Sequence, residues 1–262
     1  MISEKAVVEN KEHLAEGIYG AWLKTSAARD AHPGQFVMLN TKSEAHLLGR
    51  PISICDIDRD KERLRLVWRV AGYGTDEFSR LEEGDRVELL GPLGNGFDIS
   101  SLSGAENIAV MGGGIGAPPL LGLVKQLHVR GLKNIDVYLG YRSSSAGLFL
   151  ADEFKELAAV HIATDDGTEG TRGTVLDALD SSGKVPDLIY ACGPMPMLKG
   201  VKQYAEEKRI PAYISLEERM ACGVGACLGC VVKTRYKDTH SRVENARICT
   251  EGPIFAAKDV DI

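Results

Sequence analysis

The sequence predicts an antiparallel β-barrel, then an open parallel α/β domain, and finally a small cysteine-rich segment. Short runs with a two-residue period dominate from about residue 16 to 91, which indicates antiparallel strands. From residue 107 onward, predicted strands alternate with helical segments, as is typical of a parallel sheet. Four of the six cysteines follow residue 217. We therefore expect three units, at 1–100, 101–214 and 215–262.

The composition is that of an ordinary folded protein. Of 262 residues, 44% are hydrophobic and 26% are charged, which excludes a disordered tail, a collagen and a coiled coil. Lys and Arg total 31 against 37 for Asp and Glu, a net charge of -6. Because no basic block is present, we expect no nucleic-acid partner.

The N-terminus and the longest uncharged stretch argue against export and against membrane insertion. Met1–Lys5 leads into charged residues rather than an apolar signal core. Asn107–Val124 is uncharged, but its glycines and prolines are too many for an ordinary spanning helix. We therefore expect a cytoplasmic protein without a membrane segment.

The barrel prediction rests on alternation. Between Arg63 and Val70, Leu64, Leu66 and Trp68 fall on one face with Val70, and arginines fall on the other, which predicts a half-buried strand. Further strands are predicted at Ile18–Leu23, Gln35–Leu39, Pro51–Ile54 and Arg86–Leu90.

The α/β prediction rests on five apolar runs separated by helical patterns. Asp98–Glu106, which is rich in serine, is expected to link this domain to the barrel. The predicted strands are Asn107–Met111, Asn134–Leu139, Val160–Ala163, Asp187–Ala191 and Ala212–Leu216.

The cysteine pattern carries the strongest chemical signal. Cys222, Cys227 and Cys230 form C-x4-C-x2-C, and Cys249 follows after 18 residues, which is the plant-type ferredoxin spacing for a [2Fe-2S] cluster. Gly223, Gly225 and Gly229 would let the loop turn its amides toward the cluster. A four-thiolate zinc site remains open, whereas a reducing cytoplasm argues against two disulfides. Cys55 is expected to be a buried small apolar residue.

Two short motifs in the barrel suggest a flavin diphosphate. Arg50-Pro51-Ile52-Ser53 places a planar guanidinium and a hydroxyl along one strand, although a strand with a surface ion pair would look similar. Gly72-Tyr73-Gly74-Thr75 precedes a short helix whose first amides could meet phosphate. The alternative is a glycine turn with Thr75 as the N-cap.

The second domain contains a dinucleotide-like motif. Gly112, Gly114 and Gly116 belong to GGGIGA, which satisfies G-x-G-x-x-A after a predicted strand. The usual acidic ribose ligand is absent, because the next strand ends in GYR; Arg142 there suits a 2′-phosphate or is a solvated charge, so NADH and NADPH both remain open. Cys192-Gly193 ends another strand, at the edge where such sheets bind ligands, although a buried structural cysteine is the alternative.

The order RPIS, GYGT, GGGIGAPP and CGP resembles the ferredoxin-NADP reductase superfamily, in which a flavin-binding barrel precedes a nicotinamide-binding domain. MACGVGACLGC, GPLGNGF, TDDG and ICTEGPIF narrow this to a resemblance to the electron-transfer subunits of class 1B dihydroorotate dehydrogenases, iron-sulfur flavoproteins of pyrimidine (UMP) biosynthesis. The resemblance implies a [2Fe-2S] cluster on the four cysteines. It also implies an FAD held by Arg50 to Ser53, Val67, Trp68, Arg69, Gly74 and Thr75.

The resemblance further implies a partner. In that family an FMN-containing catalytic subunit oxidises dihydroorotate to orotate, NAD+ is the acceptor, and two copies of each chain form a heterotetramer. Since the substrate chemistry belongs to the partner, His161 and Glu217 are expected to be structural residues. Two alternatives remain: an NAD(P)H:ferredoxin or sulfur reductase subunit of the same superfamily, and a zinc-stapled binding protein without a flavin.

Overall fold

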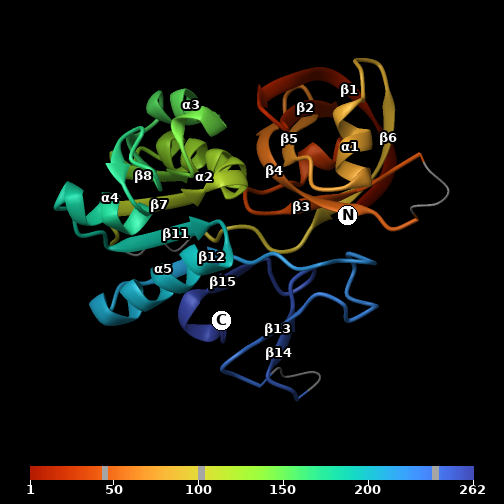
Figure 1. Cartoon of the computed structure of the whole chain (residues 1–262). Coiled ribbons are helices and arrows are strands. Elements are labelled where there is room, and N and C mark those ends of the chain that lie inside the picture. The colour runs from red at the N-terminus through yellow and green to blue at the C-terminus, as the bar shows by residue number, and fades with distance from the viewer. Residues whose placement is uncertain (43–46, 100–103, 238–241) are drawn as a thin grey trace.

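The computed structural model describes residues 1–42, 47–99, 104–237 and 242–262. Figure 1 shows a barrel and an α/β layer side by side, with the C-terminal segment below both. The two large sheets are a closed antiparallel barrel and a mostly parallel seven-stranded sheet, which confirms the predicted fold class. The predicted linker Asp98–Glu106 falls partly on residues 100–103, outside the described residues. No described helix is both long enough and apolar enough to cross a membrane.

Six strands close the barrel in the order β1-β2-β5-β4-β3-β6. The predicted barrel strands are all present. Their bounds are β1 (Ile2–Ala15), β2 (Ile18–Lys24), β3 (Phe36–Asn40), β4 (Arg50–Asp58), β5 (Arg63–Arg69) and β6 (Arg86–Leu93), and the short helix α1 (Tyr73–Ser79) lies between the last two.

The first strand was missed by the sequence analysis, which began the barrel at Glu16. Only two of the 14 residues of β1, Ala6 and Val8, are buried. Most of the other positions are charged or polar, so the apolar alternation along the strand is weak. Its first half pairs with β6 and its second half with β2. These two pairings close the barrel, so its strand character depends on partners that a local pattern does not reveal.

The β5 strand is buried on both faces, which corrects the prediction of a half-buried strand. Leu64, Leu66 and Trp68 face the barrel core as expected. Arg65 and Val67, on the other face, are only 5% and 4% exposed. The α/β domain covers that face, since Val67 belongs to the apolar cluster that the domain forms.

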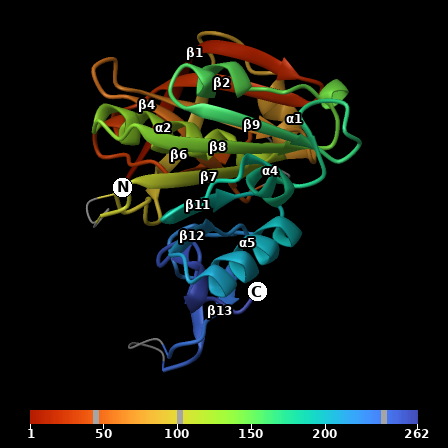
Figure 2. The same ribbon diagram turned by 90° about the vertical axis from the view of Figure 1, so that its left-hand side faces the viewer.

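The α/β sheet has the order β10-β9-β8-β7-β11-β12-β15, and all five predicted strands are among these seven. In Figure 2 the strands follow one another downward from β9 to β12. The bounds are β7 (Asn107–Gly113), β8 (Asn134–Tyr141), β9 (Ala159–Thr164), β10 (Thr171–Arg172), β11 (Leu188–Cys192), β12 (Ala212–Ser215) and β15 (Ile254–Ala256).

Helices cover both faces of this sheet. One apolar cluster joins helices α2 (Pro118–Val129) and α3 (Ala151–Lys155) to one face, and a second joins α4 (Val175–Ser182) and α5 (Met195–Lys208) to the other. The α2 helix also packs on β4 of the barrel. This helix therefore lies between the two large units.

Charged side chains cross the same boundary. Arg65 donates to Glu12 of β1 at 2.7 Å and to Glu153 of α3 at 2.6 Å. Lys125 of α2 donates to Asp56 of β4 at 2.5 Å. Because a buried arginine that lost these carboxylates would be left unpaired, the contacts hold the barrel and the sheet in one relative position.

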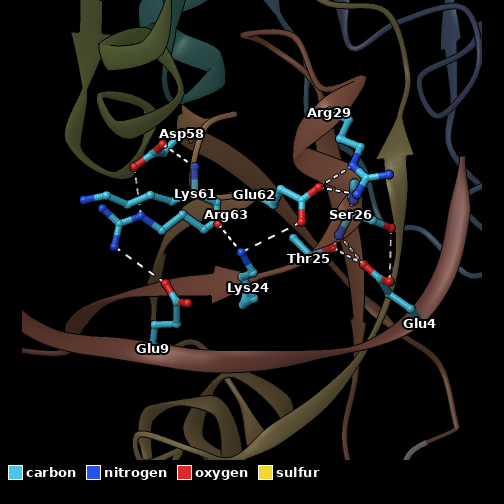
Figure 3. A network of polar contacts seen from close by, with 11 residues as sticks. Glu4, Glu9, Lys24, Thr25, Ser26, Arg29, Asp58, Lys61, Glu62 and Arg63 are labelled. Atoms are coloured by element: carbon cyan, nitrogen blue, oxygen red, sulfur yellow. Dashed lines mark hydrogen bonds and ion pairs between the residues drawn. The ribbon is translucent and has the colours of Figure 1, made fainter.

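A second polar network lies within the barrel (Figure 3). The Glu4 carboxylate accepts from the Ser26 backbone N–H at 2.7 Å and from the Thr25 hydroxyl. Burial opposes ionisation of Glu4, but these hydrogen bonds outweigh it and lower its pKa. Arg29 and Lys24 both pair with Glu62 nearby. We assign the network a structural role, because it ties β1 to the turn after β2.

The C-terminal segment is tied to both large units. Strands β13 (Val231–Lys233) and β14 (Asn245–Arg247) pair with each other, and β15 adds to the α/β sheet antiparallel to β12. Cys230 and Cys249 belong to one apolar cluster with Phe36 and Met38 of the barrel. The cysteine-bearing segment is thus anchored by sheet pairing and by a shared core.

Candidate cofactor sites

A cavity of about 890 Å³ opens where the three units meet. This volume lies within the range of small-molecule and cofactor sites. The barrel contributes β4 and β5, the α/β domain contributes Ile115 and Pro119, and the C-terminal side contributes Ser215–Met220 and Pro253. The cavity therefore joins all three parts of the chain.

Most of the residues predicted to hold a flavin line this cavity. They are Arg50, Pro51, Ile52, Ser53, Val67, Trp68, Arg69 and Thr75. Gly74 lies directly behind Arg50, since a Cβ on Gly74 would be 2.7 Å from Arg50 Nε. The absence of a side chain at Gly74 thus leaves room for the arginine beside the start of α1.

The Thr75 hydroxyl is occupied by its own turn. It accepts from the backbone N–H groups of Ala71 at 2.9 Å and Gly72 at 3.2 Å, and it donates to the Gly72 carbonyl oxygen at 3.0 Å. Gly72 is the N-cap of α1, with Thr75 three residues later. The alternative with Thr75 as the N-cap is therefore wrong, because Thr75 takes the third helical position and its hydroxyl accepts from the N-cap backbone. Its carbonyl oxygen accepts from Trp68 Nε1 at 3.2 Å.

The dinucleotide-like loop and the Cys192-Gly193 loop are in direct contact. Cys192 pairs with Gly112 of β7 on one side and with Ser215 of β12 on the other. A Cβ on Gly116 would lie 2.4 Å from the Cys192 carbonyl oxygen and 2.6 Å from Gly193 Cα. The predicted residues are therefore brought together at the carboxyl edge of three adjacent strands.

Gly114 and Cys192 differ in their surroundings. Gly114 has φ +52°, and a Cβ placed on it would meet no atom within 4 Å, so its reason for being glycine is conformational. Cys192 is 1% exposed, and burial raises the pKa of its thiol. Pro118 and Pro119 begin α2, and proline lacks an N–H, so this helix start offers an anion fewer N–H donors than a helix without proline there.

The four C-terminal cysteines gather as two contacting pairs. Cys222 lies against Cys227, and Cys230 lies against Cys249. All six cysteines of the chain are free thiols. No group of three or more Cys, His, Asp or Glu side chains that could hold one metal ion is formed within the described parts of the chain.

Backbone amides surround the cysteine sulfurs. The N–H groups of Val224 and Cys227 donate to Cys222 Sγ at 3.5 and 3.4 Å, and the N–H of Gly229 donates to Cys227 Sγ at 3.4 Å. Burial opposes ionisation of Cys222, but these donors outweigh it and lower its pKa to about 6. Burial and the adjacent Cys230 instead raise the pKa of Cys249 to about 11. The amides fit a group that carries negative charge on sulfur.

Two of the three glycines predicted to shape this loop adopt positive φ. Gly223 has φ +70° and Gly225 has φ +81°. Gly229 does not, but its N–H donates to Cys227 Sγ, as expected of an amide turned toward the cluster; the left-handed residue beside it is Leu228, with φ +57°. Leu228 is 63% exposed and Cys227 is exposed beside it, whereas Cys230 and Cys249 are buried.

Glu217, which was expected to be a structural residue, lines the cavity. Burial raises the pKa of this carboxyl, and the charge of Arg69, which also lines the cavity, partly offsets the effect. Its position directly after a strand, at the carboxyl edge of the sheet, was the available signal. His161 is structural as expected: its Nε2 is 2.8 Å from Asp136 Oδ1, and its ring stacks on Tyr138.

Comparison with known families agrees with this arrangement. Residues 217–261 match the iron-sulfur cluster binding domain of dihydroorotate dehydrogenase B, and residues 110–203 match the oxidoreductase NAD-binding domain. The NADH-dependent reduced ferredoxin-NADP oxidoreductase structure has 30% identity and a TM-score of 0.86 over 98% of this chain and 90% of that chain. A Neisseria gonorrhoeae ferredoxin NADP+ reductase with bound FAD and NADP has 15% identity and a TM-score of 0.67 over 78% and 91%, a likeness of fold alone.

Curated relatives match almost end to end. Several are named dihydroorotate dehydrogenase B (NAD(+)), electron transfer subunit. The Enterococcus faecalis OG1RF protein is 41% identical over 98% of this chain and 97% of the relative. The Listeria monocytogenes serovar 1/2a protein is 41% identical over 99% of both chains. The Fusobacterium nucleatum protein of the same name is 39% identical over 99% and 98%. The chain therefore belongs to the family of dihydroorotate dehydrogenase B electron transfer subunits.

Proposed function

We propose that this chain carries electrons between NAD(H) and the FMN of a partner catalytic subunit that oxidises dihydroorotate to orotate in pyrimidine biosynthesis, with NAD+ as the acceptor. One observation carries the proposal. The wall Ser215–Met220 lines the cavity and leads without interruption into Cys222. A single short segment thus connects the cavity with the cysteine loop.

FAD is proposed to occupy the cavity against β4, β5 and the start of α1. Arg50 suits the diphosphate because its planar fork can bind two oxygens. Pro51, Ile52, Ser53, Val67, Trp68 and Arg69 are proposed to surround the ring and its tail, with Gly74 and Thr75 beside the phosphates. The cavity lining supports this set, and the contact between Gly74 and Arg50 supports the placement of the diphosphate.

NAD(H) is proposed to bind along the carboxyl edge of the sheet at Gly112, Gly114, Gly116, Cys192 and Gly193. The open face of Gly114 supports close approach of a ligand there. Glu217 lines the cavity proposed for FAD and would orient the nicotinamide end of NAD(H) there. Arg142 is exposed, so the preference for NAD(H) over its phosphorylated form rests on the relatives' names.

A [2Fe-2S] cluster is proposed on Cys222, Cys227, Cys230 and Cys249. The two contacting pairs suit two irons that take two thiolates each, and the amide donors suit the charge on sulfur. When bound, flavin and cluster together supply the conversion of a two-electron hydride into single electrons. The chain's own residues bind, orient and insulate these groups. The proposed functional units remain 1–100, 101–214 and 215–262.

The FMN-containing partner is proposed to dock on the exposed part of the cysteine loop. Val224 and Leu228 are 41% and 63% exposed, and Ala226 lies between them. Large apolar side chains without charge are typical of interface cores. A heterotetramer of two copies of each chain is proposed on the family resemblance. The six free thiols favour a reducing compartment, which supports the proposed cytoplasmic location.

The function is tested by Cys249→Ser in the chain copurified with its partner. Because the buried fourth ligand is lost, we expect the [2Fe-2S] absorbance and transfer to the partner to disappear. NADH should still reduce the bound FAD, since the cavity is untouched. Cys55→Ser, a buried cysteine of the barrel, is the matched control and should keep a full iron-sulfur spectrum. A colourless, zinc-containing wild-type protein would contradict the proposal.

A further inference from the structure

Thr250 directly follows Cys249 and is held in place by its backbone. Its N–H donates to the Arg247 carbonyl oxygen at 3.2 Å, and its carbonyl oxygen accepts from Asn95 Nδ2 at 3.1 Å. Both backbone contacts fix the turn that carries Cys249. The Thr250 side chain is therefore confined to one side of that turn.

The hydroxyl of Thr250 is buried without a hydrogen-bond partner within the described residues. Buried hydroxyls normally have a partner, because an unpaired one loses its hydrogen bonds to water without replacement. No cysteine sulfur of the chain accepts from this oxygen either. Such an atom points to a partner that the described part of the chain does not supply.

The surroundings of the hydroxyl belong to the cysteine loop. A Cβ on Gly225 would lie 3.4 Å from Thr250 Oγ1 and 2.9 Å from Thr250 Cγ2. Gly225 lies between Cys222 and Cys227, and its backbone N–H donates to the sulfur of Cys249. Thr250 therefore packs against the stretch of backbone that already directs an amide at a cysteine sulfur.

We propose that the Thr250 hydroxyl donates a hydrogen bond to a sulfur of the bound [2Fe-2S] cluster and raises its reduction potential. This rests on the proposed cluster site. A donor to sulfur stabilises the more negative, reduced form, and hydrogen bonds to sulfur are among the factors that set these potentials. Thr250 is thus a positioning residue that tunes the cluster and does not ligate it.

Thr250→Val removes the hydroxyl and keeps the shape, whereas Thr250→Ser keeps the hydroxyl. Both are compared with the wild type in the cluster-loaded chain by redox titration of the cluster's EPR signal. We expect Thr250→Val to lower the ratio of reduced to oxidised cluster about tenfold at a fixed potential, a shift of about 59 mV for one electron. Thr250→Ser should stay close to the wild type.

The matched control is Thr234→Val. Thr234 is a buried threonine of the same segment whose hydroxyl donates to the Tyr236 carbonyl oxygen at 2.7 Å. This variant should lose stability without a shift of the cluster potential. Equal shifts in Thr234→Val and Thr250→Val would overturn the proposal, because they would trace the shift to packing.

A second measurement covers variants that load poorly. Electron-nuclear double resonance of the reduced cluster in H₂O and D₂O should show an exchangeable proton coupling in the wild type and in Thr250→Ser that Thr250→Val lacks. Unchanged potential and coupling in Thr250→Val would overturn the proposal, as would loss of loading in both Thr250 variants. Loading in Thr250→Ser alone would support it. A wild type without any [2Fe-2S] signal would instead contradict the proposed function.

Discussion

The chain has two glycine-rich loops, at 112–116 and 223–229, and their glycines serve different purposes. In the first loop, Gly116 makes room for another stretch of backbone, since a Cβ there would be 2.4 Å from the Cys192 carbonyl oxygen. In the second, Gly223 and Gly225 adopt positive φ, and neighbouring amides point at cysteine sulfurs. Packing alone requires glycine at 116, whereas positive φ favours glycine at 223 and 225.

This difference shows that a glycine pattern alone does not reveal what the glycines do. In the usual dinucleotide motif, individual glycines serve a tight turn, approach of a ligand, or helix packing. Here Gly116 is committed to internal packing, and Gly114 has an open side. We therefore expect a substitution at Gly116 to damage the whole fold, and one at Gly225 to damage cluster binding.

The largest expected effect is that of Gly116→Ala. Its Cβ would collide with the backbone of Cys192 and Gly193, neither of which is a flexible side-chain end. We expect a loss of about 3 kcal/mol in the free energy of unfolding, measured by urea denaturation. Gly114→Ala is the control, and it should lose only about 1 kcal/mol, the cost of positive φ without a clash. Equal losses would erase the difference between the two loops.

A smaller and more local effect is expected for Gly225→Ala. At φ +81° the new side chain is strained by roughly 1–2 kcal/mol, and its Cβ would lie 2.9 Å from Thr250 Cγ2. We expect the iron content and the [2Fe-2S] absorbance to fall while the FAD content is unchanged. Gly229→Ala keeps the amide and meets only Cys227 Sγ at 3.5 Å, so it should load normally. Loss of FAD in Gly225→Ala would show that the cavity depends on this loop.

The smallest effect is expected for Leu228→Gly. This change relieves the left-handed strain at φ +57° but adds freedom to the unfolded chain, so we expect a net gain of only about 0.5 kcal/mol in unfolding free energy. Leu228→Ala keeps the strain and should show no gain. Both variants lose the exposed leucine side chain, so both should bind the partner subunit more weakly than the wild type does in a binding titration. A gain in Leu228→Ala would trace the effect to the exposed side chain and not to the backbone.

Features that depend only on residues close together in the sequence could be predicted from the sequence. The spacing of Cys222, Cys227 and Cys230 is a local property, and so is the alternation that identifies β5. The five parallel strands were found because each consists mostly of apolar residues. Because RPIS precedes GGGIGA, the sequence also predicted that the barrel comes before the α/β domain.

Features that depend on distant partners were decided by the tertiary structure. The β1 strand is defined by β2 and β6, and Arg65 is buried because Glu153 arrives from the α/β domain. Glu217 enters the cavity because β12 ends beside β11, and the Thr250 hydroxyl is enclosed because Gly225 folds over it. Local patterns record backbone preference and burial of a single face. Pairing, enclosure and desolvation arise only when segments far apart in the chain come together.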